Sequence, residues 1–335
     1  MELNVLWFIL ITVLFVGFFF LEGFDYGVGI LLPFLGKNDT ERRMLIQTIG
    51  PVWDGNEVWM ITAGGALFAA FPSAYATLFS GFYLALFLLL LGLIVRGAAF
   101  EFRSRDESPG WRSTWDGMIF IGSFLPALLW GVAVTNLIQG VPINDKMQYV
   151  GTFFDLLSLY TVVGGLAFLL VFTFHGSLFL TLKVEKGNLM ERARKIALAV
   201  GVAAAVVFLG LVGLTYTNTG LFRNSGAAVS LLAAVLAFVF AYCFVYGRRF
   251  GLAFVLNSLS VALTTAAFFW GLFPRLMVSS LNPEWSLTIY NAASTPYTLK
   301  IMTIAALILV PVILLYQGWT YWVFRKRVTA KDLEY

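Results

Sequence analysis

The sequence predicts an all-α integral membrane protein with nine transmembrane helices. Of its 335 residues, 60% are hydrophobic and only 12% are charged, whereas soluble domains carry roughly 25% charged residues. Apolar runs long enough to span a bilayer, which needs about 20 residues, recur along the whole chain. Alternating ten-residue strand patterns are absent, and backbone groups cannot stay unpaired in hydrocarbon, so the runs are expected to be helices. We therefore expect one polytopic membrane domain over residues 1–335.

The nine apolar segments follow one another with short connections. They lie at about 5–33, 53–75, 77–99, 117–139, 152–182, 196–217, 226–247, 252–274 and 299–323. The first lacks the basic start and the cleavage site of a signal peptide, so it is expected to remain as a span. The second and third meet near Phe71-Pro72-Ser73, where Pro72 marks a break or, alternatively, a kink in one long helix. After Pro274, the segment 275–300 mixes aromatic and turn residues, which fits a plug at the membrane interface or a flexible loop.

Basic residues are distributed unevenly between the connecting segments. With the N-terminus outside, only Lys146, Arg223, Arg275 and Lys300 of the 22 Lys and Arg lie outside, which leaves 18 on the cytoplasmic side. Cytoplasmic segments of membrane proteins are enriched in Lys and Arg, so this orientation is predicted. The basic end of the chain then lies in the cytoplasm. The net charge of +4 is thus accounted for by topology, and no nucleic-acid partner is expected.

Four carboxylates in or next to apolar segments are the candidate functional residues. Glu22 and Asp25 lie in LEGFDYGVG, and Asp54 and Glu57 lie in PVWDGNEVW. An acidic residue at the centre of a membrane helix costs about 2.5 to 3.5 kcal/mol and generally faces protein or water. A spacing of three places each pair on one helical face, where protons can pass between carboxylates. The alternative is a structural role, and Asp54 after Pro51 is well placed to cap a helix.

Several other polar and aromatic residues are weaker candidates for a functional role than these carboxylates. Trp53 and Trp59, with Asn56 between them, could border a partner subunit or a quinone, or the tryptophans could be interfacial belt residues. His175 is the only histidine and is expected to be structural, since a haem with two histidine ligands cannot form in this chain. Cys243 is the only cysteine, so we expect no disulfide and no metal site. A phosphate-binding GxxxxGK[ST] loop is absent from the sequence.

Four stretches resemble subunit II of the cytochrome bd-type quinol oxidases. They are GFDYGVGILLPFLGKNDTERR (23–43), IGPVWDGNEVWMITAGGALFAAFP (49–72), FIGSFLPALLWGVAVTNLIQGVP (120–142) and SLTIYNAASTPYTL (286–299). The resemblance implies nine helices paired pseudosymmetrically with a haem-bearing subunit I, which oxidises quinol and reduces O2 to water. It associates the carboxylates of the GFD and WDGN motifs, here Asp25 and Asp54, with proton supply from the cytoplasm. Glu57 stands where relatives can carry Gln, and Glu22 completes the set of proton-pathway candidates.

The resemblance also implies the cofactors and partners of the complex. Haem b and haem d are expected on subunit I, and this chain is expected to ligate neither and to be inactive alone. The complex is expected to be an electrogenic quinol:oxygen oxidoreductase in the bacterial cytoplasmic membrane. A structural quinone in this chain and a small accessory single-span subunit are further components that some members have. The segment TNTGLFRNSG (217–226) is shorter than in some relatives, so features of that insertion are not carried over.

Two other functions would give a similar sequence. A proton-coupled secondary transporter also has carboxylates at mid-membrane depth, but it predicts inverted repeats and broken helices, which are not plain here. A purely structural anchor would hold its carboxylates in ion pairs, for instance with Arg96.

Overall fold

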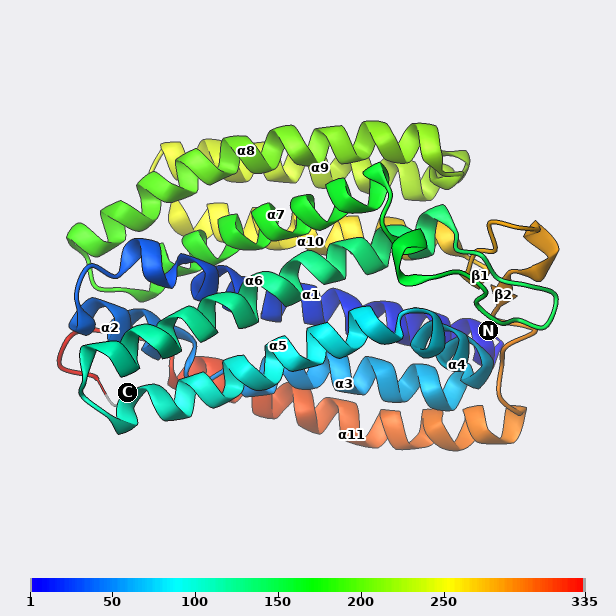
Figure 1. Ribbon diagram of the computed structural model, residues 1–335, viewed down its shortest axis with the longest axis horizontal. Coiled ribbons are helices and arrows are strands. Elements are labelled where there is room, and N and C mark those ends of the chain that lie inside the picture. The colour runs from blue at the N-terminus through cyan, green and yellow to red at the C-terminus, as the bar shows by residue number, and fades with distance from the viewer. Residues whose placement is uncertain (1, 334–335) are drawn as a thin grey trace.

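In a computed structural model that describes residues 2–333, the chain folds as an elongated bundle of long helices (Figure 1). The helices are α1 (Leu3–Leu35), α2 (Asp39–Ile49), α3 (Trp53–Ala70), α4 (Pro72–Gly81), α5 (Tyr83–Phe102), α6 (Pro109–Gln139), α7 (Leu159–Lys183), α8 (Asn188–Asn218), α9 (Ser225–Tyr246), α10 (Phe250–Leu272) and α11 (Pro296–Val323). Four 3-10 turns, η1 (Arg103–Arg105), η2 (Phe153–Leu156), η3 (Leu221–Arg223) and η4 (Pro283–Trp285), and the strands β1 (Arg275–Met277) and β2 (Leu287–Thr288) lie between them.

Helix α1 is the centre of the bundle. It contacts α3, α6, α7 and α10, and from Phe18 onward most of its residues are buried. Its closest neighbour is α7, because Gly27 and Gly176 face each other and an added Cβ at Gly27 would lie 2.0 Å from the Phe172 carbonyl oxygen. Small residues permit such close approach between membrane helices. Helix α11 lies at one side of the bundle next to α3, and Leu299 is its only buried residue (Figure 1).

The region expected to hold the second and third spans contains three helices. Helix α3 ends at Ala70, Pro72 begins the short helix α4, and α5 begins at Tyr83. Phe71, just before the proline, has φ −135° and ψ 65°, as expected because a following proline disfavours helical geometry. Pro72 is thus a break and not a kink. The expected limits at 53–75 and 77–99 differ from the helices for this reason.

Other helix limits also differ from the expected spans. The expected spans follow the apolar residues, whereas a helix extends as far as its backbone hydrogen bonds continue. The segment expected from 152 onward forms the turn η2, closed by a capping box of Thr152 and Asp155, and α7 begins only after its own N-cap Ser158. Helices α6 and α8 begin earlier than 117 and 196, since backbone hydrogen bonding continues through their charged first turns. The unexpected helix α2 is amphipathic and lies between α1 and α3 in the chain.

Within residues 2–333, eight helices are long and apolar enough to cross a membrane by length and composition. Helix α3, with 18 residues that include Asp54, Asn56 and Glu57, is not among them. The count of nine spans and the orientation of the termini therefore remain predictions.

The segment after α10 is folded onto the end of the bundle that carries the N-terminus (Figure 1). The Val141 backbone N–H donates to the Val278 carbonyl at 2.9 Å, and the Ser279 hydroxyl donates to the Ile143 carbonyl at 2.7 Å. The Asn4 amide donates to the Ile289 carbonyl at 3.2 Å. These contacts tie the segment to the start of α1 and to the α6–α7 connection, as a plug requires.

Candidate functional site

Arg96 of α5 is the centre of a buried ionic cluster. Its side chain is fully buried and forms ion pairs with Glu22 of α1 and with Glu57 of α3, the latter at 3.0 Å. The guanidinium also lies over the Tyr26 ring, 4.8 Å from its centroid. Glu22 is fully buried, whereas the side chain of Glu57 is 17% exposed. Two of the four predicted carboxylates are thus held by one cation, as the structural alternative supposed.

Asp25 lies beside this ionic cluster but is held differently. It is fully buried, and its Oδ2 accepts a hydrogen bond of 2.7 Å from the Asn56 amide. Its Oδ1 is buried without a hydrogen-bond partner among the described residues. Asp25 takes part in none of the ion pairs found within residues 2–333. Asp25 is therefore a buried carboxyl group without a directly paired cation.

Asn56 connects Asp25 to helix α11. Its Oδ1 accepts hydrogen bonds from the Tyr321 hydroxyl at 2.8 Å and from the Gln317 amide at 3.3 Å. Gln317 in turn accepts a hydrogen bond of 2.8 Å from the Trp59 indole. These contacts join α1, α3 and α11, and they orient Asn56 so that its amide nitrogen faces Asp25. We call Glu22, Asp25, Glu57, Arg96 and Asn56 the carboxylate cluster.

The carboxylate cluster contains more acidic than basic groups. Its three carboxyl groups face a single guanidinium. Burying an ionised carboxylate without a counter-charge is very unfavourable, and such a group is generally neutralised instead. The arrangement can therefore hold an exchangeable proton.

Asp54 lies outside the carboxylate cluster. It is exposed and occupies the first turn of α3, where a negative charge is favoured by the helix dipole. The N-cap position belongs to Val52, and no side chain caps this helix. Asp54 therefore does not cap α3 in the way that the sequence suggested. Its spacing of three from Glu57 still places both on one side of α3.

The two tryptophans of this segment have internal contacts. The Trp53 ring lies 5.0 Å from Phe100, centroid to centroid, and Trp59 packs on Gly17 in addition to its bond with Gln317. Both are half-buried in this chain. A contact with a quinone or a partner subunit, expected for Trp53, Asn56 and Trp59, stays a prediction.

His175 uses both ring nitrogens within the protein. Nε2 lies 3.0 Å from the Phe20 carbonyl, and Nδ1 lies 3.0 Å from the Asn257 amide nitrogen. The ring stacks on Phe254 and is fully buried. With the Asn257 amide in this orientation, Nε2 donates to the Phe20 carbonyl and Nδ1 accepts from the Asn257 amide. Groups of three or more His, Cys, Asp or Glu that could hold a metal are not found in the described part of the chain.

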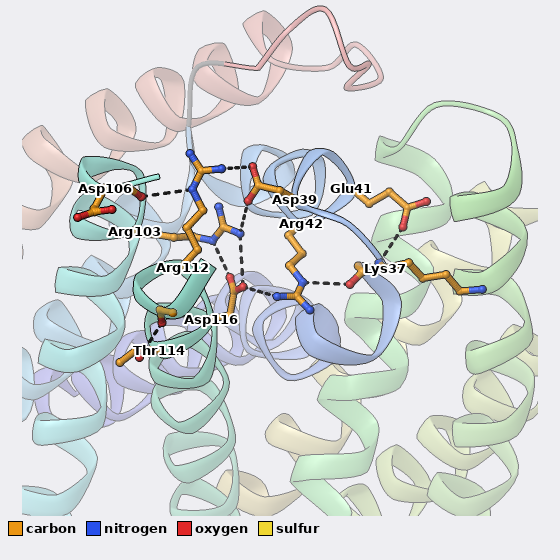
Figure 2. Close-up of polar contacts among 11 residues, drawn as sticks. Lys37, Asp39, Glu41, Arg42, Arg103, Asp106, Arg112, Thr114 and Asp116 are labelled. Carbon is orange, nitrogen blue, oxygen red and sulfur yellow. Dashed lines mark hydrogen bonds and ion pairs between the residues drawn. The ribbon is translucent and has the colours of Figure 1, made fainter. Parts of the chain in front are cut away.

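A second ionic network lies at the opposite end of the bundle from the N-terminus, where α2, η1 and α6 meet (Figure 2). Asp116 accepts from Arg103 at 2.6 Å and from Arg42 at 2.8 Å. Asp39 accepts from Arg103 at 2.9 Å and from Arg112 at 2.6 Å. We call these five residues the terminal network. It has three cations for two carboxylates, so every carboxylate has two partners.

Glu41 of α2 extends the contacts of this end to α8. Partial burial raises the pKa of Glu41, but hydrogen bonds from the Arg192 guanidinium and the Lys37 backbone N–H outweigh it and hold the pKa below its ordinary value. Glu41 is therefore ionised at neutral pH and ties α2 to α8.

Sequence reasoning missed how the carboxylate cluster is connected. Tyr321 and Gln317 lie more than 250 positions from Asn56, and nothing in their local sequence indicates a polar contact. Their only signal is a pair of hydrogen-bonding side chains near the end of an otherwise apolar segment. The terminal network carried a clearer signal, since Arg103, Arg112 and Asp116 are charged residues at the margins of apolar runs.

Comparisons with known proteins agree on one family. Residues 3–324 match the family model of cytochrome bd terminal oxidase subunit II. The chain is 45% identical over 333 residues to cytochrome bd ubiquinol oxidase subunit 2 of Bacillus subtilis (strain 168), covering 99% of this chain and 98% of that protein. It is 39% identical over 368 residues to cytochrome bd-I ubiquinol oxidase subunit 2 of Escherichia coli (strain K12), covering 99% and 97%. Its fold is similar to a chain of the bd oxidase from Geobacillus thermodenitrificans, with a TM-score of 0.77, 19% identity, and coverage of 97% of this chain and 100% of that one.

Proposed function

Because the chain belongs to the cytochrome bd terminal oxidase subunit II family, we propose that its carboxylate cluster supplies protons to the oxygen-reducing site of the complex. The chain is a subunit of a terminal oxidase and works as part of a quinol oxidase complex. The secondary-transporter alternative is not favoured by these relatives. Oxygen reduction to water consumes protons, and a membrane interior supplies them through titratable groups and ordered water.

Asp25 is the group that carries the proton in this proposal. The supporting observation is that it is fully buried, lacks a paired cation and has one carboxyl oxygen without a partner. A proton on Oδ1 would neutralise the group, while Oδ2 keeps its hydrogen bond from Asn56. Release of that proton leaves an anion that Asn56 and the nearby Arg96 stabilise. Asp25 can therefore alternate between both states without rearrangement of its neighbours.

The other carboxylates either position Arg96 beside Asp25 or pass protons toward Asp25. Arg96 holds Glu22 and Glu57 as ion-pair partners, so their main role is to fix the guanidinium between α1, α3 and α5. Asp54, exposed in the first turn of α3, collects protons at the surface and passes them inward past Glu57. In this order the exposed residue is the entrance and Asp25 the internal carrier.

The cofactors of the complex are assigned to the partner subunit. The residues of this chain do not fit a histidine-ligated haem, because both ring nitrogens of His175 already have protein partners. Haem b and haem d would supply the electron transfer and the oxygen chemistry from subunit I. A structural quinone and an accessory single-span subunit remain components that the family allows.

The proposed orientation has the N-terminus outside and the C-terminus in the cytoplasm of a bacterium. It is supported by the 18 of 22 basic residues that this arrangement places inside. The carboxylate cluster and Asp54 then lie toward the cytoplasmic half, where the protons come from. Nine spans in one membrane domain complete the proposal.

Asp25→Asn and Asp54→Asn, each in the purified complex, test this function. Both amides keep the shape of the side chain and lose the titratable proton. We expect normal haem absorption but a large loss of oxygen consumption and proton uptake in Asp25→Asn, and a smaller loss in Asp54→Asn. Glu22→Gln is the matched control for loss of a buried carboxylate, and it should mainly lower thermal stability. Normal turnover of a fully assembled Asp25→Asn complex would refute the proposal.

A further inference from the structure

A polar cavity of about 780 Å³ is lined by residues at the end of the bundle that carries the N-terminus (Figure 1), and no residue of the carboxylate cluster lines it. It is formed where α6, α8 and α10 end and α9 begins. Its polar lining includes Gln139, Thr217, Asn218 and the two arginines Arg223 and Arg275. None of its lining residues, all of which the structure describes, is acidic. We call it the arginine cavity.

The guanidinium groups of Arg223 and Arg275 have no protein partner within residues 2–333. The ion pairs of the described chain involve other arginines, and neither of these two side chains donates a hydrogen bond. Among residues 2–333, the further Lys and Arg side chains expected on this side of the membrane are Lys146 and Lys300. Two of these four basic side chains, Arg223 and Arg275, therefore line a single cavity and remain available to a ligand.

The helix ends around the cavity do not cancel this charge. Each helix C-terminus carries roughly half a negative elementary charge and each N-terminus roughly half a positive one. The ends of α6, α8 and α10 together therefore offset less than the two guanidinium groups, and the start of α9 adds positive potential. Asn224 already caps that start by accepting from Gly226 and Ala227. The arginine cavity is net positive, and guanidinium groups are well suited to bind phosphate oxygens.

Aromatic residues place the arginine cavity at the level of lipid headgroups. Tyr216, next to the lining residue Thr217, is 69% exposed and contacts Phe222, and Trp270, next to Gly271, is 53% exposed. Exposed aromatic residues at helix ends mark the membrane–water interface. Toward the membrane interior, α8 and α9 present exposed apolar side chains such as Leu209 and Leu232, which suit acyl chains. We infer that the arginine cavity binds the headgroup phosphate of an anionic phospholipid in the adjacent leaflet.

Lipid titration of the purified complex, followed by native mass spectrometry, tests this site. Wild-type complex should bind phosphatidylglycerol more tightly than phosphatidylethanolamine. Arg223→Gln and Arg275→Gln should each weaken phosphatidylglycerol binding roughly fivefold, as expected for one basic residue near a membrane surface. Lys146→Gln, which removes an exposed cation at the same end but outside the cavity, should leave binding unchanged.

The same titration distinguishes the sources of phosphate and can overturn the inference. Inorganic phosphate added alone should not displace the lipid, because it lacks the acyl chains that pack on α8 and α9. Displacement by inorganic phosphate would identify a free anion as the ligand and contradict the lipid assignment. Equal affinity of wild type for the two lipids, which needs no variant, would also contradict it. So would unchanged phosphatidylglycerol binding after both arginines are replaced.

Discussion

The carboxylate cluster and the terminal network are built from the same residue types but balance them in opposite ways. In the terminal network three arginines face two aspartates, and each aspartate has two cationic partners. In the carboxylate cluster one arginine faces three carboxyl groups, and Asp25 has no ion pair. A balanced network stabilises one structure. An unbalanced one must hold a proton to remain buried, and in the proposed function this difference separates a structural role from proton transfer.

The unpaired atoms of the two regions support this contrast. Within the described residues, the carboxylate cluster leaves five polar atoms buried without hydrogen-bond partners, namely Glu22 Oε2, Asp25 Oδ1, Glu57 Oε1 and two nitrogens of Arg96. The terminal network leaves only Nη1 of Arg103. Buried polar atoms without partners are costly, so they point to sites where water or protons are bound. The carboxylate cluster therefore keeps unpartnered polar atoms that can bind water or protons, whereas the terminal network is nearly saturated.

Arg96→Gln should have the largest effect on stability. It removes the only cation of the carboxylate cluster and leaves Glu22 and Glu57 without a partner, which typically costs about 3 to 5 kcal/mol for a buried pair. We expect a low yield of assembled complex and a lower thermal midpoint, measured by haem absorption and thermal unfolding. Adding Glu22→Gln should restore part of the loss. Full stability of Arg96→Gln alone would show that the cluster is not held by this arginine.

Asp116→Asn should destabilise the terminal network without slowing the enzyme. The amide keeps one acceptor but weakens the bonds from Arg103 and Arg42, a loss of about 1 to 3 kcal/mol. We expect a lower thermal midpoint and normal turnover per assembled complex. Slow turnover with normal stability would instead place Asp116 on the proton path and remove the distinction between the two regions.

Tyr321→Phe should weaken the orientation of Asn56. It deletes the 2.8 Å hydrogen bond to Asn56 Oδ1 and leaves the longer one from Gln317. The expected loss is about 0.5 to 1.5 kcal/mol of stability, together with a moderate fall in turnover, because Asn56 holds Asp25. Thr320→Ser, which retains a hydroxyl on the neighbouring residue, is the control. Turnover equal to that of the wild type would indicate that the orientation of Asn56 does not depend on its hydrogen bond from Tyr321 of α11.

Glu41→Gln should have the smallest effect. Because the pKa of Glu41 is lowered in the folded protein, its contribution is present above the ordinary pKa and is lost as the pH falls through the lowered value. An ion pair near the surface contributes about 1 kcal/mol or less. Thermal midpoints measured from neutral to acidic pH should therefore show a slightly shallower decline for Glu41→Gln. An identical acid dependence in both proteins would contradict this role.

The sequence singled out Glu22 and Asp25, which the structure buries, because a charge within an apolar run needs an explanation. Glu22 and Asp25 were found in this way, and Arg96 was recognised as a candidate counter-ion. Which carboxylate pairs with Arg96 could not be predicted, because it depends on how α1, α3 and α5 rotate against each other. The sequence favoured Asp54 as the main proton relay, with Asp25 as the second candidate, yet the structure leaves Asp54 exposed in the first turn of α3 and buries Asp25.

The fold shows the same limits. Apolar length predicted where long helices lie, but it could not predict that Ser158 caps α7 or that charged turns extend α6 and α8. Hydropathy measures contact with lipid, whereas helix ends are set by capping side chains and proline. The contact of α11 with Asn56 could not be predicted from the sequence either, since Tyr321 and Asn56 are 265 positions apart.

The infrared difference spectrum of the oxidised and reduced complex tests the central claim most directly. If Asp25 carries an exchangeable proton, wild type should show the C=O stretching band of a protonated carboxyl group that changes with redox state. That band should be lost in Asp25→Asn and retained in Asp54→Asn and Asp116→Asn. A spectrum in which Asp25→Asn keeps the wild-type band would show that the proton resides elsewhere and would contradict the assignment of Asp25 as the internal carrier.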